Sequence, residues 1–299
     1  MRIGYPCINR SIGCSANRTF RLASYSDGRL LETAKANIAC LRQILAWNRD
    51  HEILFFRITS DLVPFASHPV CTVPWQEQCA EELAATGDFI RKSGMRISMH
   101  PDQFIILNAP DPGVVERSIA ELRYHAEVLD LMQLPVSAKI QLHVGGVYGN
   151  REESIDRFVR TYGSLDPKTR RRLVVENDDS RFTAADCLAI HVRTKIPVLF
   201  DVFHHACLNR GEEMRSLLPA IERTWNNADG PAMIDYSSQN PGKRPGGHAD
   251  HIDRADFENF LAHSKPHDPD VMLEIKDKEK SAPEAIEAAR SDPRFIGGR

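Results

Sequence analysis

The chain has 299 residues, 42% of them hydrophobic, and a formal net charge of −3 with histidine counted as neutral. This length can bury one large core, and a closed α/β barrel typically uses about 250 residues, so we expect a single domain over residues 1–299. The acidic balance excludes a molecule-wide positive field that would draw the chain onto nucleic acid or an anionic membrane, so any basic surface must be local.

Short apolar runs alternate with helical patterns along the whole chain. We expect strands at residues 2–6, 53–58, 95–100, 139–143, 173–176, 197–201, 232–235 and 271–274. Helical patterns cover residues 31–45, 76–93, 115–129, 152–162, 183–193, 212–223, 255–263 and 282–290. Eight strand-helix units within this length favour a TIM-type (β/α)8 barrel over an open doubly wound sheet.

The cysteines and the apolar segments indicate the compartment. The seven cysteines are an odd number and contain no CxxC pair or regular spacing, so we expect reduced thiols. The N-terminal MRIGYPCINR lacks the apolar core of a signal peptide, and nowhere do 18 apolar residues run together. We therefore expect a cytoplasmic protein without membrane association, close to the nucleoid if its source is prokaryotic.

Six of the apolar runs end on a residue that can bind a divalent metal. These residues are His100, His143, Glu176, Asp201, Asp235 and Glu274. In a parallel barrel the C-terminal ends of all strands meet at one mouth, so these side chains should converge there. Four buried carboxylates would repel one another severely without cations. His204, one turn beyond Asp201, and His248 in the loop after the seventh strand complete a set large enough for two or three ions.

The ligand types narrow the metal and the chemistry. Imidazole and carboxylate without thiolate argue against a structural zinc site, and the dominance of oxygen favours Mn²⁺, with Mg²⁺ or catalytic Zn²⁺ as alternatives. Clustered ions suit the hydrolysis of phosphate diesters, because they activate water and clamp the attacking and leaving oxygens. The motifs GxSxG, GxxxxGK[ST] and GxGxxG are absent from the sequence. We therefore expect a metal-dependent phosphodiesterase.

Two other classes share parts of this pattern. A metal-dependent sugar isomerase or epimerase of similar barrel architecture would need only one or two ions and a closed small pocket. The loops after the first, second, third and seventh strands are instead long and polar, which suits an extended substrate such as DNA. A DNA-damage sensor built on an inactive barrel is disfavoured by the nearly complete ligand set.

Seven segments of the chain resemble one known family. They are GYPC at 4–7, PFASHP at 64–69, SMHPDQF at 98–104, ENDD at 176–179, DVFHH at 201–205, SSQNPGKRPGGHAD at 237–250 and MLEIKDKEK at 272–280. Together they are similar to the ultraviolet damage endonuclease family. The resemblance implies a barrel related to the trinuclear apurinic endonucleases. It also implies cleavage of damaged duplex DNA immediately 5′ to cyclobutane pyrimidine dimers and (6-4) photoproducts, leaving a 3′-hydroxyl and a 5′-phosphate.

The resemblance covers the metal ligands with one departure. His100, His143, Glu176, Asp201, His204, His248 and Glu274 match the family's ligand positions. The family usually has histidine where this chain has Asp235, and relatives often carry a lysine, which can be carboxylated, where this chain has Met233. The number of ions is therefore open, and exchanging imidazole for carboxylate should favour Mn²⁺ or Mg²⁺ over Zn²⁺.

The resemblance also implies residues that act on DNA. Gln103 and Phe104 match a pair that replaces damaged bases in the stack, although relatives commonly have tyrosine at position 104. Tyr5, Asn9 and His68 match positions near the site, and for His68 an ordinary loop hydrogen bond is an alternative to phosphate contact or proton transfer. We expect Glu176, Glu274 and His68 to be catalytic, and no obligate protein partner is evident. Lys243, Arg244 and Lys276, with Arg10, Arg18, Arg21 and Lys278, should form a basic rim for phosphates.

Overall fold

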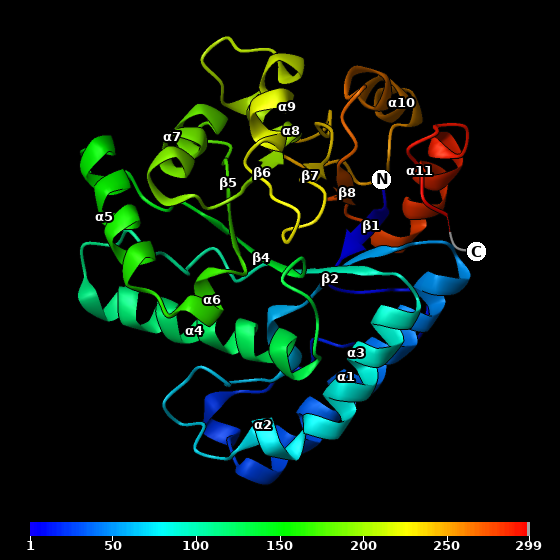
Figure 1. The fold of residues 1–299 in the computed structure, drawn as a ribbon. Helices are drawn as coiled ribbons and strands as arrows, with labels where there is room; N and C mark the ends of the chain where they lie inside the picture. The colour runs from blue at the N-terminus through cyan, green and yellow to red at the C-terminus, as the bar shows by residue number, and fades with distance from the viewer. Residues whose placement is uncertain (298–299) are drawn as a thin grey trace.

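Eight parallel strands close into a barrel, and helices surround it (Figure 1). The computed structural model describes residues 1–297. The strands are β1 (Ile3–Pro6), β2 (Phe55–Ile58), β3 (Arg96–Met99), β4 (Lys139–His143), β5 (Leu173–Glu176), β6 (Val198–Asp201), β7 (Met233–Tyr236) and β8 (Asp270–Leu273). They follow one another in chain order, and β1 pairs with β8 to complete the ring. The predicted TIM-type barrel is confirmed.

Helices connect the strands and cover the outside of the barrel. The α-helices are α1 (Asp27–Asp50), α2 (Trp75–Gln78), α3 (Ala80–Lys92), α4 (Pro112–Leu131), α5 (Arg151–Ser164), α6 (Pro167–Arg170), α7 (Ala184–Thr194), α8 (Val202–Cys207), α9 (Met214–Glu222), α10 (Arg254–His263) and α11 (Ala282–Ala289). The helix expected at 76–93 is divided at Cys79, and α8, which begins directly after Asp201, is an additional helix. Among residues 1–297, every helix is too short or too polar to span a lipid bilayer.

The barrel interior is built in layers of different chemistry. Near the N-terminal ends of the strands, Arg96 pairs with Asp270 at 2.9 Å and Lys139 pairs with Asp229 at 2.5 Å. Above them lies an apolar cluster of Phe55, Val174, Leu199, Met233 and Met272. Residues two apart along a strand share a face. The next interior-facing residues toward the C-terminal ends of the strands are therefore Arg57, Glu176, Asp201, Asp235 and Glu274. The apolar layer thus separates two charged layers.

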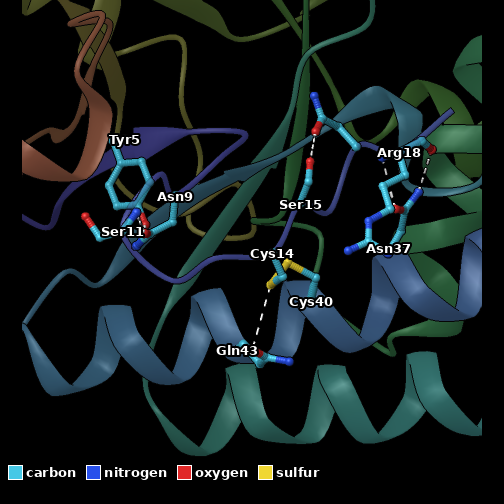
Figure 2. Close-up of a disulfide and its surroundings, with 10 residues drawn as sticks. Tyr5, Asn9, Ser11, Cys14, Ser15, Arg18, Asn37, Cys40 and Gln43 are labelled. Carbon is cyan, nitrogen blue, oxygen red and sulfur yellow. Dashed lines mark hydrogen bonds between the residues drawn. A yellow bond between two sulfur atoms is a disulfide. The ribbon is translucent and has the colours of Figure 1, made fainter.

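A disulfide ties the loop after β1 to helix α1 (Figure 2). The Cα atoms of Cys14 and Cys40 lie 5.9 Å apart, as a disulfide requires. The expectation of seven reduced thiols is wrong for this pair, because their separation of 26 residues did not reveal that the loop folds back onto the helix. The side chain of Asn37 holds the same loop, since it exchanges two hydrogen bonds of 3.0 Å with the backbone of Arg18 (Figure 2). The loop is therefore fixed against α1 at two points.

Strands β1 and β2 approach each other closely at Gly4. A Cβ atom at this position would lie 1.6 Å from the main-chain oxygen of Phe55, the residue that pairs with Gly4 across the ladder. No side chain fits there, so glycine is required for this pairing. The pairing in turn sets the position of β1, from which the loop carrying Asn9 leaves the barrel.

Replacing Gly4 with alanine should destabilise the protein by at least the ~1–3 kcal/mol typical of overpacking, because the obstacle is main chain rather than a movable side chain. The free energy of unfolding in urea measures this. The control is Gly28→Ala on α1, where a Cβ meets nothing within 4 Å, and its stability should be unchanged or higher by about 1 kcal/mol. Equal stability of the two variants would contradict the close approach.

Candidate metal centre at the barrel mouth

The structure gathers the eight predicted metal ligands at the C-terminal mouth of the barrel. Strand ends position six of them: His100 follows β3, His143, Glu176 and Asp201 end β4, β5 and β6, Asp235 lies in β7, and Glu274 follows β8. His204 lies on α8, and His248 forms an isolated antiparallel bridge with Gln239 in the loop after β7. Side chains separated by up to 174 positions thus share one site, although their role as ligands stays a prediction.

Glu176 lies at the centre of this group. Its Oε2 is 3.4 Å from Nε2 of His100, and its Oε1 is 3.9 Å from Nε2 of His143 and 3.5 Å from Nδ1 of His204. One donor atom each from His100, His143 and Glu176 lie within 4.8 Å of one another, and the same holds for Glu176, Asp201 and His204. One carboxylate therefore belongs to two sets of ligands and can bridge two ions.

A third set contains carboxylates only. Donor atoms of Asp201, Asp235 and Glu274 lie within 4.8 Å of one another. His248 lies beside this set, with Nδ1 3.9 Å from Oε2 of Glu274 and its ring centre 6.0 Å from that of His204. The predicted ligands therefore form one continuous cluster.

Backbone carbonyls orient three of the histidines. Nδ1 of His100 lies 2.8 Å from the carbonyl of Pro101, Nδ1 of His204 lies 3.0 Å from that of Asn177, and Nδ1 of His248 lies 2.9 Å from that of Glu274. A carbonyl only accepts hydrogen bonds, so each Nδ1 donates, and Nε2 is the nitrogen through which each ring would bind a metal. The three imidazole rings are thus held in fixed orientations.

Buried oxygens in the cluster lack a partner within the protein. Oδ2 of Asp201 and Oδ1 of Asp235 accept no hydrogen bond from the described residues, although both side chains are fully buried. Leaving a buried polar atom without a partner costs about 1–3 kcal/mol, more when it is charged. A bound cation removes this cost, so the residues present fit divalent ions.

The pKa values show how strongly the cluster needs positive charge. Burial raises the pKa of Asp235 to about 7 and holds the pKa of Asp201 well above its usual value. Burial alone would lower the pKa of His204, but the carboxylates of Asp201 and Glu176 raise it to about 11. Protons therefore supply part of the positive charge, and a divalent ion would displace them on binding.

Two residues of the site were not identified from the sequence. Arg57 of β2 is buried, and its guanidinium donates to Glu274 and, at 2.6 Å, to Oδ2 of Asp235. Gln141 of β4 donates through Nε2 to Oε2 of Glu176 at 2.9 Å and to Oδ2 of Asp235 at 2.7 Å. The sequence did contain one indication of such residues. In a buried strand, a polar residue two positions from an interior apolar residue must also face the barrel interior.

The predicted DNA-contacting loop lies at the edge of the cluster. Gln103 and Phe104 line a cavity of about 570 Å³ together with His100, His143 and Glu274. The side chain of Phe104 is 73% exposed. His68 lines a neighbouring cavity of about 530 Å³, which it shares with Phe104, so it lies farther from the carboxylates.

The basic rim is smaller than its sequence suggests. Lys243 and Lys276 both pair with Asp250, with nitrogen to oxygen distances of 3.4 Å and 3.2 Å. Lys278 lines the 570 Å³ cavity, and no acidic group among the described residues lies within ion-pair distance of its ammonium. Arg244, like Arg10, Arg18 and Arg21, is exposed.

Tyr5 and Asn9 are buried rather than exposed at the mouth. The hydroxyl of Tyr5 donates to Oδ1 of Asn48 on α1 at 2.6 Å. It also accepts from Nδ2 of Asn9 at 2.9 Å (Figure 2). Asn9 also accepts from the backbone of Ser11 through Oδ1 at 2.8 Å. These contacts fix the start of the loop after β1, and direct contact with DNA stays a prediction for both residues.

Comparison with known proteins shows which family this chain belongs to. The model of the family described as UV-endonuclease UvdE matches residues 1–289. The chain belongs to the UV-endonuclease UvdE family. The UV DNA damage endonuclease of Clostridium perfringens (strain 13 / Type A) is 35% identical over 292 residues, which cover 97% of this chain and 71% of that protein. That of Bacillus thuringiensis subsp. konkukian (strain 97-27) is 32% identical over 289 residues, covering 93% and 91%.

Solved structures agree with this membership of the UvdE family. The crystal structure of SacUVDE superposes with a TM-score of 0.93 and 45% identity, covering 97% of this chain and 98% of that one. D-Psicose 3-epimerase from Clostridium cellulolyticum H10 has a TM-score of 0.55 at 11% identity, covering 84% of this chain and 91% of that one. The epimerase shares the fold alone.

Replacing Glu176 with glutamine in this UvdE-family chain should remove more than one bound metal ion, because the carboxylate belongs to two ligand sets. Metal content by mass spectrometry after dialysis against Mn²⁺ measures the loss. The exposed Glu213→Gln is the control and should keep the full content. Unchanged metal content in the Glu176 variant would contradict the central position of Glu176.

Proposed function

We propose that the chain is a metal-dependent DNA repair endonuclease. It hydrolyses the phosphodiester bond immediately 5′ to cyclobutane pyrimidine dimers and (6-4) photoproducts, leaving a 3′-hydroxyl and a 5′-phosphate. One observation carries this proposal: the buried carboxylate and histidine cluster lies beside an open cavity of about 570 Å³ that is also lined by Phe104 and two lysines. The family supports it, because the relatives are named UV DNA damage endonucleases.

Two or three divalent ions complete the proposed site, with Mn²⁺ favoured and Mg²⁺ or Zn²⁺ as alternatives. When bound, they supply Lewis acidity that activates water and neutralises charge on the phosphate. His100, His143, Glu176, Asp201, His204, Asp235, His248 and Glu274 hold them. We assign catalytic roles to Glu176 and Glu274 through their place in this cluster.

The lysines at the rim bind the DNA backbone. Asp250 neutralises part of the charge of Lys243 and Lys276. Its pair with Lys276 also connects the loop after β7 to the loop after β8, and both lysines face phosphates in this proposal. Within residues 1–297 Lys278 has no acidic partner, and it borders the cavity. Burial lowers its pKa, and an anionic phosphate next to the ammonium would offset that cost. We therefore add Lys278 to Lys243, Arg244 and Lys276 as phosphate contacts.

Phe104 and Gln103 recognise the lesion in this proposal. An exposed phenyl ring gains free energy when it stacks on bases, and the adjacent amide can satisfy base edges that have lost their partners. Ultraviolet photoproducts disturb stacking, so the duplex opens at lower cost at the lesion than elsewhere. Insertion of Phe104 would then distinguish damaged from intact DNA.

His68 contacts a phosphate in our proposal. Its Nδ1 accepts a hydrogen bond from the backbone nitrogen of Val70 at 3.0 Å, so the proton lies on Nε2. Nε2 can donate to a phosphate oxygen beside the cavity that Phe104 borders. This role suits the position of His68 better than proton transfer at the carboxylate cluster does.

We further propose damaged duplex DNA as the partner, a single domain over the chain and action in the cytoplasm, next to the nucleoid in a prokaryote. Incision of ultraviolet-irradiated supercoiled plasmid in Mn²⁺ tests the function. We expect nicks that depend on irradiation, disappear in Glu176→Gln and carry 3′-hydroxyl ends that a polymerase extends. A sugar epimerase would leave the plasmid intact, and a damage sensor would bind without cutting, so either result would overturn the proposal.

Phe104→Ala should weaken binding to a duplex that contains one photoproduct by roughly 5-fold to 150-fold, because stacking on a base contributes about 1–3 kcal/mol. Fluorescence anisotropy measures the affinity, and metal content should not change. Val192→Ala is the matched control, since Val192 is 68% exposed on α7 and should leave binding unaltered. Wild-type affinity in the Phe104 variant would exclude the wedge.

A further inference from the structure

In the carboxylate-only set, which consists of Asp201, Asp235 and Glu274, each carboxylate has one oxygen that accepts hydrogen bonds and one that accepts none from the part of the chain that the structure describes. Oδ1 of Asp201 accepts the backbone N–H of His204 at 2.7 Å. Its Oδ2 accepts no hydrogen bond from the described residues, although Nδ1 of His204 lies 3.4 Å away. Oδ2 of Asp235 accepts from Arg57 and Gln141, and its Oδ1 accepts no hydrogen bond within residues 1–297. Oε1 of Glu274 accepts from Arg57, and Oε2 receives no hydrogen bond within the described residues. Each carboxylate is thus held through one oxygen and left open at the other.

Arg57 holds two of these carboxylates at once. Its two terminal nitrogens reach different acceptors, Nη1 to Glu274 on the β8 side and Nη2 to Asp235 on β7. A planar guanidinium fixes the direction of both bonds, which a flexible ammonium cannot do. The charge also matters, because three carboxylates and one guanidinium leave two net negative charges, and one divalent ion balances these.

Gln141, an uncharged residue of β4, also restricts the orientation of Asp235. Its Nε2 donates to Oδ2 of Asp235 and to Oε2 of Glu176, so it connects the carboxylate-only set to the carboxylate shared by the histidine sets. Both side chains lie on inward positions of β4 and β7 and are fully buried. The amide therefore sets the orientation of Asp235 without adding charge.

We propose that Arg57 and Gln141 are positioning residues that orient Asp235 and Glu274, so that these two carboxylates and Asp201 bind one divalent ion through three carboxylate oxygens. Oxygen ligands select hard cations, so this position takes Mn²⁺ or Mg²⁺ in preference to Zn²⁺. The two sets that contain histidine lack this selectivity. One position of the centre therefore differs from the others in ion preference, and Arg57 and Gln141 set that difference.

Charge-conserving substitutions separate orientation from electrostatics. Arg57→Lys keeps the positive charge but loses the two-pronged contact, and Gln141→Met keeps the volume but loses the amide. Groups that orient metal ligands typically contribute 10-fold to 100-fold in metal affinity. We expect each variant to weaken the binding of one Mn²⁺ ion by that factor. In Arg57→Lys the ions held by the histidine sets should bind as before, whereas Gln141→Met also removes a hydrogen bond to Glu176 and should weaken the ions that Glu176 holds.

Equilibrium dialysis of the full-length protein against graded Mn²⁺, with ions counted by mass spectrometry, measures this without DNA. In the wild type, Zn²⁺ competition should displace the ion of the carboxylate-only set least. Superimposable Mn²⁺ binding curves for the wild type and both variants would overturn the proposal, and so would a wild type that lacks a Mn²⁺-selective position. Because no cleavage is measured, a protein that binds ions as described yet fails to nick irradiated DNA contradicts only the function proposed above.

Arg96→Lys provides the matched control for a structural effect. Arg96 is also a buried arginine of the barrel interior and pairs with Asp270, but it lies at the opposite end of the strands. This variant should lower the melting temperature and leave the Mn²⁺ binding curve unchanged. If that curve shifted as much as it does for Arg57→Lys, any loss of barrel stability would weaken Mn²⁺ binding, and the proposal would fail.

Discussion

Three buried carboxylates and the partly buried Glu274 meet at one end of the barrel, and they cannot all stay ionised unless positive charge lies among them. At the other end of the same barrel the protein supplies that charge itself, because Arg96 and Lys139 pair with Asp270 and Asp229. At the mouth Arg57 pairs with Asp235 and Glu274, and burial raises the pKa of Asp235 to about 7. The difference between the two ends distinguishes a charged layer that stabilises the fold from one that is built to receive cations.

The barrel produces this concentration of charge through simple geometry. Strands β5 to β8 each place an acidic residue two positions after an apolar one, so the apolar layer carries the carboxylates directly above it. Loops then add what strands cannot. The loop after β3 exposes Phe104, and the ion pair of Asp250 with Lys276 joins the loops after β7 and β8. The proposed cation ligands and DNA contacts thus lie at one face, where active sites of this fold usually lie.

The sequence predicted the barrel and the convergence of the candidate ligands. Short apolar runs mark the strands, and residues such as His143 and Glu176 stand at the ends of those runs. It did not reveal Arg57 or Gln141, since their partners lie on strands far away in the chain and the pairing depends on barrel closure. The disulfide between Cys14 and Cys40 was not predicted for a similar reason, because it depends on how a long loop folds. The sequence did not reveal the hydrogen bond from the hydroxyl of Tyr5 to Asn48 either, because that contact depends on the packing of α1.

Anomalous scattering from crystals grown with Mn²⁺ tests the central claim most directly. The account predicts strong peaks at the barrel mouth, with one ion near His100, His143 and Glu176, a second ion sharing Glu176, and an ion bound by the oxygens of Asp201, Asp235 and Glu274. A mouth without peaks, in which the carboxylates are neutralised by protons and Arg57 alone, would contradict it.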